Sequence, residues 1–140
     1  MKFHISKYTN KYEILPKKYI KYHPIKSFGY AFEGLFLAFW RETSVRIQFL
    51  LMVILVIFCL WSGHLLLSLS HLLLGGIIIG FEIQNSAIEL ICDLVEPNQN
   101  PVVKIIKDLS SGAVLCVALV WLVVILYSFG TVFLPLFFNY

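Results

Sequence analysis

The stretch LLLSLSHLLLGGIIIGFEIQNSAIELICDL, residues 65–94, decides the fold, because an apolar run of this length matches a membrane span. The hydrocarbon core of a bilayer is about 30 Å thick, and a helix needs about 20 mostly apolar residues to cross it. Two further apolar runs cover about residues 45–64 and 109–133. The sequence therefore predicts an all-α membrane protein with three transmembrane helices.

The composition also indicates that lipid surrounds most of the chain. Hydrophobic residues make up 59% of its 140 residues and charged residues only 14%. Soluble globular domains average about 45–50% apolar and about 25% charged residues. A single domain of this length cannot bury such an excess of apolar surface, which argues against a water-soluble fold.

Seven of the eleven Lys and Arg residues lie within residues 1–26, and no charged side chain follows Asp108. Because Lys- and Arg-rich segments stay on the cytoplasmic side of a membrane, we expect a cytoplasmic amino terminus, a cytoplasmic loop at 95–108 and an outside carboxyl terminus. The basic segment lacks the ordered Arg and aromatic residues of a base-reading surface, so no nucleic-acid partner is expected.

Residues 27–41 separate this basic segment from the first span. Large apolar residues recur there at helical spacing, namely Phe28, Phe32, Leu35, Phe36 and Phe39. This pattern predicts an N-terminal interfacial amphipathic helix, with Ser27 as its N-cap. We therefore expect a flexible basic tail at 1–26 and a membrane domain at 27–140.

Polar residues interrupt the second apolar stretch at regular spacing. At about 100° per residue, Glu82, Asn85, Glu89 and Asp93 fall within an arc of about 80° on one helix face. A carboxylate at the centre of a membrane helix costs about 3 kcal/mol, so such acids mark a functional site by default. Two simpler interpretations stay open: solvated acids at the helix end, above all Asp93 and Glu96, and polar contacts between helices.

These residue types suit phosphoryl transfer. Carboxylates hold magnesium together with substrate phosphates, and a further carboxylate can accept a proton from a hydroxyl group. A lysine can neutralise the transferred phosphate. Lys107 and Asp108 stand at the expected start of the third helix, and Glu42 stands just before the first span. The sequence contains no Walker A motif and no kinase glycine-rich loop.

Two segments closely resemble motifs of the prokaryotic diacylglycerol kinase and undecaprenol kinase family: EIQNSAIE at 82–89, followed by Asp93, and KIIKDLSSGAVL at 104–115. Residues 28–35 and 42–48 match more weakly, and the resemblance covers about residues 24–130. It implies a multi-pass lipid kinase of the bacterial inner (cell) membrane. It also implies a homotrimer of three-helix subunits, with active sites shared between neighbours.

The resemblance assigns roles to the acidic stripe. Glu82 is similar to the catalytic base that takes the proton from the lipid hydroxyl, and Asn85 would orient Glu82 and the substrate. Glu42 and Glu89 are similar to the ligands of the magnesium ion.

The resemblance also implies a site for ATP. Lys107 would contact phosphate, and Asp93 and Asp108 would support the nucleotide. Asn100 stands where many members have His, and its neutral amide can still donate a hydrogen bond to phosphate. Gln48 stands where members have His or Glu.

The expected function is ATP- and magnesium-dependent phosphorylation of a membrane lipid, either diacylglycerol to phosphatidic acid or undecaprenol to undecaprenyl phosphate. The segment SSGAVL, residues 110–115, looks more like members that favour undecaprenol, but an apolar pocket discriminates weakly between such lipids. The alternative is a non-catalytic membrane protein, such as a proton- or cation-coupled transporter subunit. Lys107, Asp108 and Glu42 separate the two, because a proton carrier needs none of them.

Overall fold

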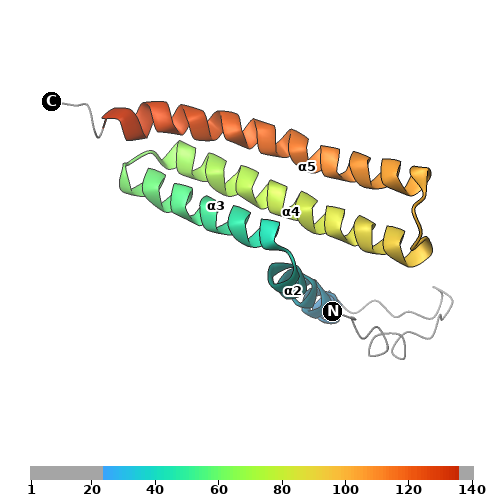
Figure 1. Cartoon of the computed structure of the whole chain (residues 1–140). Coiled ribbons are helices and arrows are strands. Elements are labelled where there is room, and N and C mark those ends of the chain that lie inside the picture. The colour runs from blue at the N-terminus through green and yellow to red at the C-terminus, as the bar shows by residue number, and fades with distance from the viewer. Residues whose placement is uncertain (1–23, 136–140) are drawn as a thin grey trace. The chain divides into compact units, whose positions relative to one another are not determined.

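The computed structural model describes residues 24–135, which form helices and no strand. The elements in chain order are α2 (Pro24–Arg41), α3 (Thr43–Trp61), α4 (Leu65–Val95), α5 (Pro101–Ser128) and a π-helical turn η2 (Phe129–Phe133) (Figure 1). The all-α prediction is confirmed. The chain divides into two compact units, residues 1–33 and 34–140. Residues 1–23 of the predicted tail lie outside the described residues.

The predicted interfacial helix forms as α2, but it begins at Pro24 rather than at Ser27. Proline fits the first turn of a helix, because the backbone N–H that it lacks has no partner there. The large side chains along α2 are exposed, with Phe28 at 69% and Trp40 at 67%. Its position at a membrane interface stays a prediction.

Arg46 of α3 binds the carboxyl end of α2. Its guanidinium donates to the carbonyl oxygens of Phe39 at 3.2 Å and Trp40 at 2.8 Å, and to the hydroxyl of Thr43 at 2.9 Å. The last carbonyls of a helix have no partner within the helix, so a side chain from the next element can satisfy them. Arg46 therefore fixes the short connection at Glu42.

Helices α3, α4 and α5 are each long and apolar enough to cross a membrane, which confirms three transmembrane helices. The 19 residues of α3 extend about 28 Å, close to the thickness of the hydrocarbon core. It ends at Trp61, earlier than the expected residue 64, because a turn follows in which Gly63 adopts a φ of +80°.

The centre of the bundle is α4, which packs against both α3 and α5. Met52, Ile78 and Trp121, one from each helix, form the buried core. Gly75 lets α3 approach α4, since a Cβ there would lie 2.5 Å from Cγ of Met52. Most other apolar side chains face outward; for example, Leu66 is 80% exposed. This surface fits lipid or further protein rather than water.

The third helix begins earlier than the sequence predicted. The expected span starts near Leu109, whereas α5 starts at Pro101, and the side-chain oxygen of Asn100 caps it by accepting from the N–H of Val102 at 2.9 Å. Pro101 is the first residue of this helix and does not end one. Lys107 therefore lies in the second turn of α5 and not at its start.

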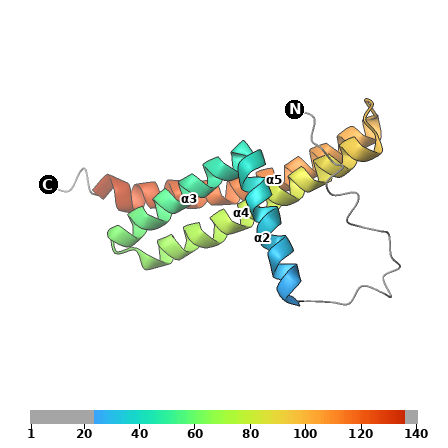
Figure 2. The same cartoon turned by 90° about the horizontal axis from the view of Figure 1, so that it is seen from below.

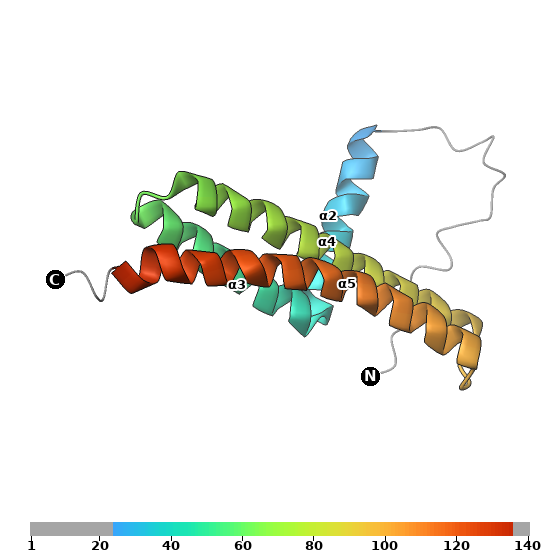
Figure 3. The same cartoon turned by 90° about the horizontal axis from the view of Figure 1, so that it is seen from above.

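Helices α4 and α5 extend beyond the first turn of α3. The 31 residues of α4 correspond to about 46 Å, well above the length of α3. In each view, the α4–α5 pair runs past the beginning of α3 toward the connecting loop 96–100 (Figures 1, 2 and 3). The candidate site extends from the level of the start of α3 into this projecting part.

Candidate functional site

The site begins where the first turns of α3 meet the middle of α4. Gln48 donates from Nε2 to Oε1 of Glu82 at 2.8 Å, and Ser44 donates from Oγ to Oε2 at 3.3 Å. Ser44 and Gln48 are four residues apart and share a face of α3. Both oxygens of the half-buried Glu82 are thus held by neutral donors, which compensates a carboxylate at this depth without a counter-charge.

One turn further along α4, Asn85 pairs with Glu89 and not with Glu82. Its Nδ2 donates to Oε1 of Glu89 at 2.9 Å, the usual spacing of side chains four residues apart. The resemblance implied that Asn85 orients Glu82, whereas in this structure Gln48 and Ser44 hold Glu82. The other side-chain atom of Asn85, Oδ1, is buried and has no hydrogen-bond partner among the described residues.

A cavity of about 600 Å³ lies between the ends of α4 and α5 and the loop 96–100. Its walls include all four residues predicted at the nucleotide site: Asp93, Asn100, Lys107 and Asp108. Binding sites for small ligands have volumes of about 300–1,000 Å³, so the cavity is large enough to hold one. The structure therefore brings together residues that are up to 15 positions apart.

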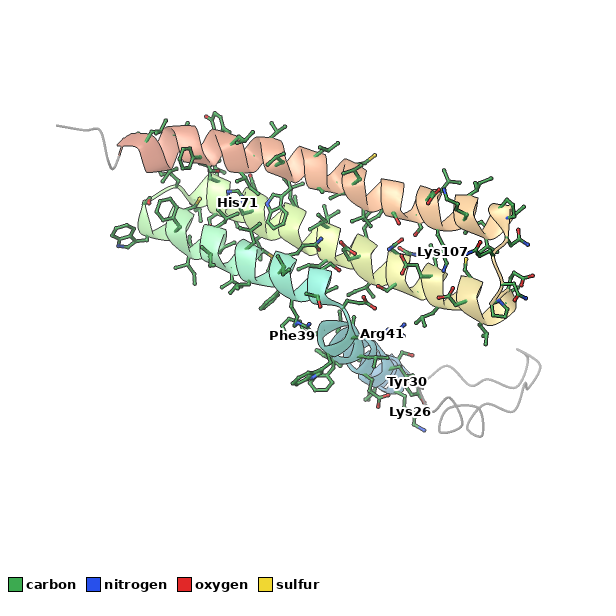
Figure 4. The ribbon with its side chains drawn as sticks, viewed as in Figure 1. Lys26, Tyr30, Phe39, Arg41, His71 and Lys107 are labelled. Carbon is green, nitrogen blue, oxygen red and sulfur yellow. The ribbon has the colours of Figure 1, made fainter. Side chains whose placement is uncertain are left out.

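Ion pairs organise the charged walls of this cavity. Lys107 donates from Nζ to Asp93 at 2.5 Å, and Lys104 donates to Asp108 at 2.8 Å. Figure 4 shows Lys107 between α4 and α5 near their connection. Lys104 is 77% exposed, so its pair with Asp108 contributes little to stability. Both ammonium groups stay accessible to an anionic ligand.

The three parts of the site follow one another along α4. From Glu82 toward the end of the helix, Glu89 lies about 10 Å and Asp93 about 16 Å further along the axis. Because Glu82 contacts α3, it lies level with the start of that helix, and Asp93 lies beyond it. The order is a held carboxylate, a carboxylate–amide pair, and a lysine-lined cavity.

Glu42 lies in the short connection between α2 and α3, as the N-cap of α3. Among residues 24–135, its carboxylate pairs with Nε of Arg41 at 3.3 Å. In the same part of the chain, no three His, Cys, Asp or Glu residues gather in a metal-binding arrangement. The predicted ligands Glu42 and Glu89 are therefore not part of a cluster of three such side chains there.

The residues at Glu89 nevertheless fit a magnesium ion. Magnesium takes oxygen ligands and usually binds through one or two protein carboxylates, completed by water and phosphate oxygens. Glu89 supplies such a carboxylate, and the unpartnered Oδ1 of Asn85 is a second oxygen donor on the same helix face. A cluster of three acidic side chains is not required for this metal.

The sequence patterns did not predict that Ser44 and Gln48 bind Glu82. Ser44 carried no signal except its spacing of four from Gln48 on a helix that enters the membrane. Gln48 was noted only as a polar departure from the family motif. Lys104 belongs to the matched motif, but its place in the wall of the cavity emerged from the structure.

The fold and the site together define a class: a small multi-pass helical membrane protein with a carboxylate site and a lysine-lined cavity at one end of its bundle. The model of the family described as prokaryotic diacylglycerol kinase matches residues 29–129, and the chain belongs to this family. Searches of curated proteins and of solved structures gave no match.

Proposed function

We propose that this protein is a kinase that transfers the γ-phosphate of ATP to the hydroxyl group of a membrane lipid, with magnesium. The acceptor is diacylglycerol or undecaprenol. The observation that carries the proposal is the placement of Glu82, held at the level where α3 begins, with a lysine-lined cavity about 16 Å further along the same helix on the projecting α4–α5 pair. Family membership supports the same reaction class.

Glu82 is the proposed general base. Each carboxylate oxygen has two lone-pair directions, so the bonds from Gln48 and Ser44 leave room to accept a third hydrogen bond from the lipid hydroxyl. In the reaction, the hydroxyl oxygen forms a bond to the γ-phosphorus as its proton moves to Glu82. The bond from the γ-phosphorus to the β–γ bridging oxygen breaks, and ADP leaves.

The cavity is the proposed site for the ATP phosphates. Lys107 would neutralise the transferring phosphate, and its contact with Asp93 would set the position of its ammonium group. Asp108 would hold Lys104 in the same way. The side-chain oxygen of Asn100 caps α5, so we assign its amide nitrogen as the donor to phosphate.

Glu89 and Glu42 are the proposed ligands of magnesium, with Oδ1 of Asn85 as a further oxygen donor. When bound, the ion would neutralise negative charge on the phosphates. Because Asn85 also donates to the carboxylate of Glu89, it would hold that carboxylate in one orientation. We propose a homotrimer whose sites are shared between neighbours, as the family resemblance implies.

The proposed location is the bacterial inner membrane, with the amino terminus and the loop 96–100 in the cytoplasm and the carboxyl terminus outside. The supply of ATP requires the cavity at this loop to face the cytoplasm. The lysines of residues 1–26 support the same orientation. Residues 27–140 would form the catalytic membrane domain, and the basic tail would lie near anionic lipid.

The test is phosphate transfer from labelled ATP with magnesium, using purified full-length protein in detergent and each lipid separately. Labelled phosphatidic acid or undecaprenyl phosphate is the expected product. A Lys107→Met variant serves as a control, because it keeps the helix and removes the charge in the cavity. Absence of transfer to either lipid by folded protein would contradict the proposal and favour the transporter-subunit alternative.

A further inference from the structure

In the side-chain amide of Gln48, the nitrogen makes a hydrogen bond and the oxygen has no partner among residues 24–135. Its Nε2 donates to Glu82 at 2.8 Å, whereas its Oε1 is buried and has no hydrogen-bond partner among residues 24–135. A buried amide oxygen normally finds a donor, so its unpartnered state requires an explanation. The only group that Gln48 contacts by a side-chain hydrogen bond in the described part of the chain is the carboxylate of Glu82.

We propose that Gln48 is a positioning residue that holds Glu82 in both of its protonation states. With Glu82 ionised, Nε2 of Gln48 donates to the carboxylate, as observed. With Glu82 protonated, the carboxyl group is itself a donor, and Oε1 of Gln48 accepts from it. A half-turn of the amide about its last side-chain bond exchanges the nitrogen and the oxygen at nearly the same positions.

Ser44 supports the same arrangement from the other side. Its hydroxyl lies 3.3 Å from the second carboxylate oxygen, and a hydroxyl both donates and accepts. Two neutral side chains on α3, each able to donate or to accept a hydrogen bond, therefore face the two oxygens of Glu82. A Lys or Arg in place of Gln48 could only donate, and would lose its partner once Glu82 had taken a proton.

The contact between Gln48 and ionised Glu82 follows from the geometry alone. The contact with protonated Glu82 rests on the proposed function, in which Glu82 receives the hydroxyl proton during each turnover. Gln48 touches neither the lipid nor ATP in this account. It acts through Glu82, by keeping the carboxyl group in one orientation before and after the proton arrives.

Infrared difference spectroscopy tests the contact without relying on activity. The spectrum of full-length protein minus that of Glu82→Gln isolates the bands of the Glu82 carboxyl group. We expect the carboxylate band to shift in Gln48→Met, which removes donor and acceptor at similar size. It should not shift in Gln84→Met, a matched change at an exposed position of α4. An unshifted band in folded Gln48→Met would overturn the inference.

The protonated state is tested in the same way after the pH is lowered until the carboxylate band is lost. The carbonyl band of protonated Glu82 should lie at higher wavenumber in Gln48→Met, because the acid group loses its acceptor. Equal wavenumbers would overturn the contact with protonated Glu82. If Gln48→Met does not fold, Gln48→Asn serves instead, since its amide is one methylene too short to reach Glu82.

Kinetics separate this inference from the proposed function. Gln48→Met should lower kcat about tenfold or more, with KM for lipid and ATP changed less than about twofold, because only the orientation of the base is lost. A band shift with no kinase activity in any protein would sustain the contact and refute the lipid kinase. If the protein is a kinase but Gln48→Met shows neither a band shift nor a fall in kcat, the role of Gln48 is refuted and the lipid kinase is not.

Discussion

Two polar clusters lie on α4, one on each side of its middle, and they differ in how completely their groups are paired. In the first, His71 is fully buried and its Nδ1 accepts from Nε1 of Trp121 at 3.1 Å. Its Nε2 then carries the proton toward Oγ of Ser128 at 2.9 Å, which donates to the carbonyl of Val124 at 2.9 Å. Figure 4 shows His71 at the end of the bundle far from Lys107.

The second cluster contains Glu82, Gln48, Asn85 and Glu89, and it is left incomplete. Within residues 24–135, three buried side-chain atoms have no hydrogen-bond partner, and two of them, Oε1 of Gln48 and Oδ1 of Asn85, belong to this cluster. A closed chain of hydrogen bonds makes the packing of two helices specific. An unpartnered buried acceptor requires an explanation, and a ligand, an ion or a proton that arrives there is one. The comparison separates a structural cluster from a candidate site.

The largest expected effect is that of Glu82→Gln on catalysis. Removing the proton acceptor should lower kcat by about 10²–10⁴-fold, the usual contribution of general base catalysis, while the fold survives because Gln can keep both contacts to α3. The measurement is phosphate transfer from labelled ATP, with gel filtration as the check of assembly. Turnover at the wild-type rate would remove Glu82 from the site.

A second effect, on the metal requirement, is expected for Glu89→Gln. Loss of one carboxylate ligand should raise the magnesium concentration at half-maximal activity about tenfold or more. The measurement is a magnesium titration of activity at saturating ATP and lipid. Glu33→Gln is the control, because Glu33 is exposed on α2 and does not line the cavity. An equal midpoint in both variants would contradict a metal role for Glu89.

A substitution in the His71 cluster should lower the stability of the protein with little loss of activity. His71→Leu leaves Nε1 of Trp121 buried without its acceptor, which costs about 1–3 kcal/mol. The thermal transition in detergent should fall, whereas kcat below that transition should stay near the wild-type value. His64→Leu is the matched control at an exposed turn position. A selective loss of kcat in His71→Leu would erase the distinction between the two clusters.

The smallest expected effect concerns the contact that holds α3 against α4. In Gly75→Ala the new Cβ would lie 2.5–2.9 Å from three atoms of Met52, so this side chain must move, at a cost of about 1 kcal/mol or more. Gly76→Ala has no atom within 4 Å and should be neutral. Thermal transitions of both variants test the pair. Equal transitions would show that Met52 adapts without cost.

The sequence by itself determined the number of spans, the polar loop between the second and third spans and the stripe of acids on one face of α4. Each of these follows from local rules: the length of apolar runs, the positions of Gly and Pro, and the period of a helix. The resemblance of residues 82–89 and 104–115 to the family motifs was confirmed by the family match. The roles assigned to single residues remain proposals.

Only the tertiary structure decided which side chains meet. Gln48 reaches Glu82 across 34 positions of sequence, and Trp121 reaches His71 across 50. Helices in a membrane are apolar on nearly all faces, so hydrophobic periodicity does not determine how they rotate against each other. Close packing at Gly75 and the paired polar groups set that rotation. As a result, Glu82 packs against α3, and Asn85 forms its hydrogen bond with Glu89.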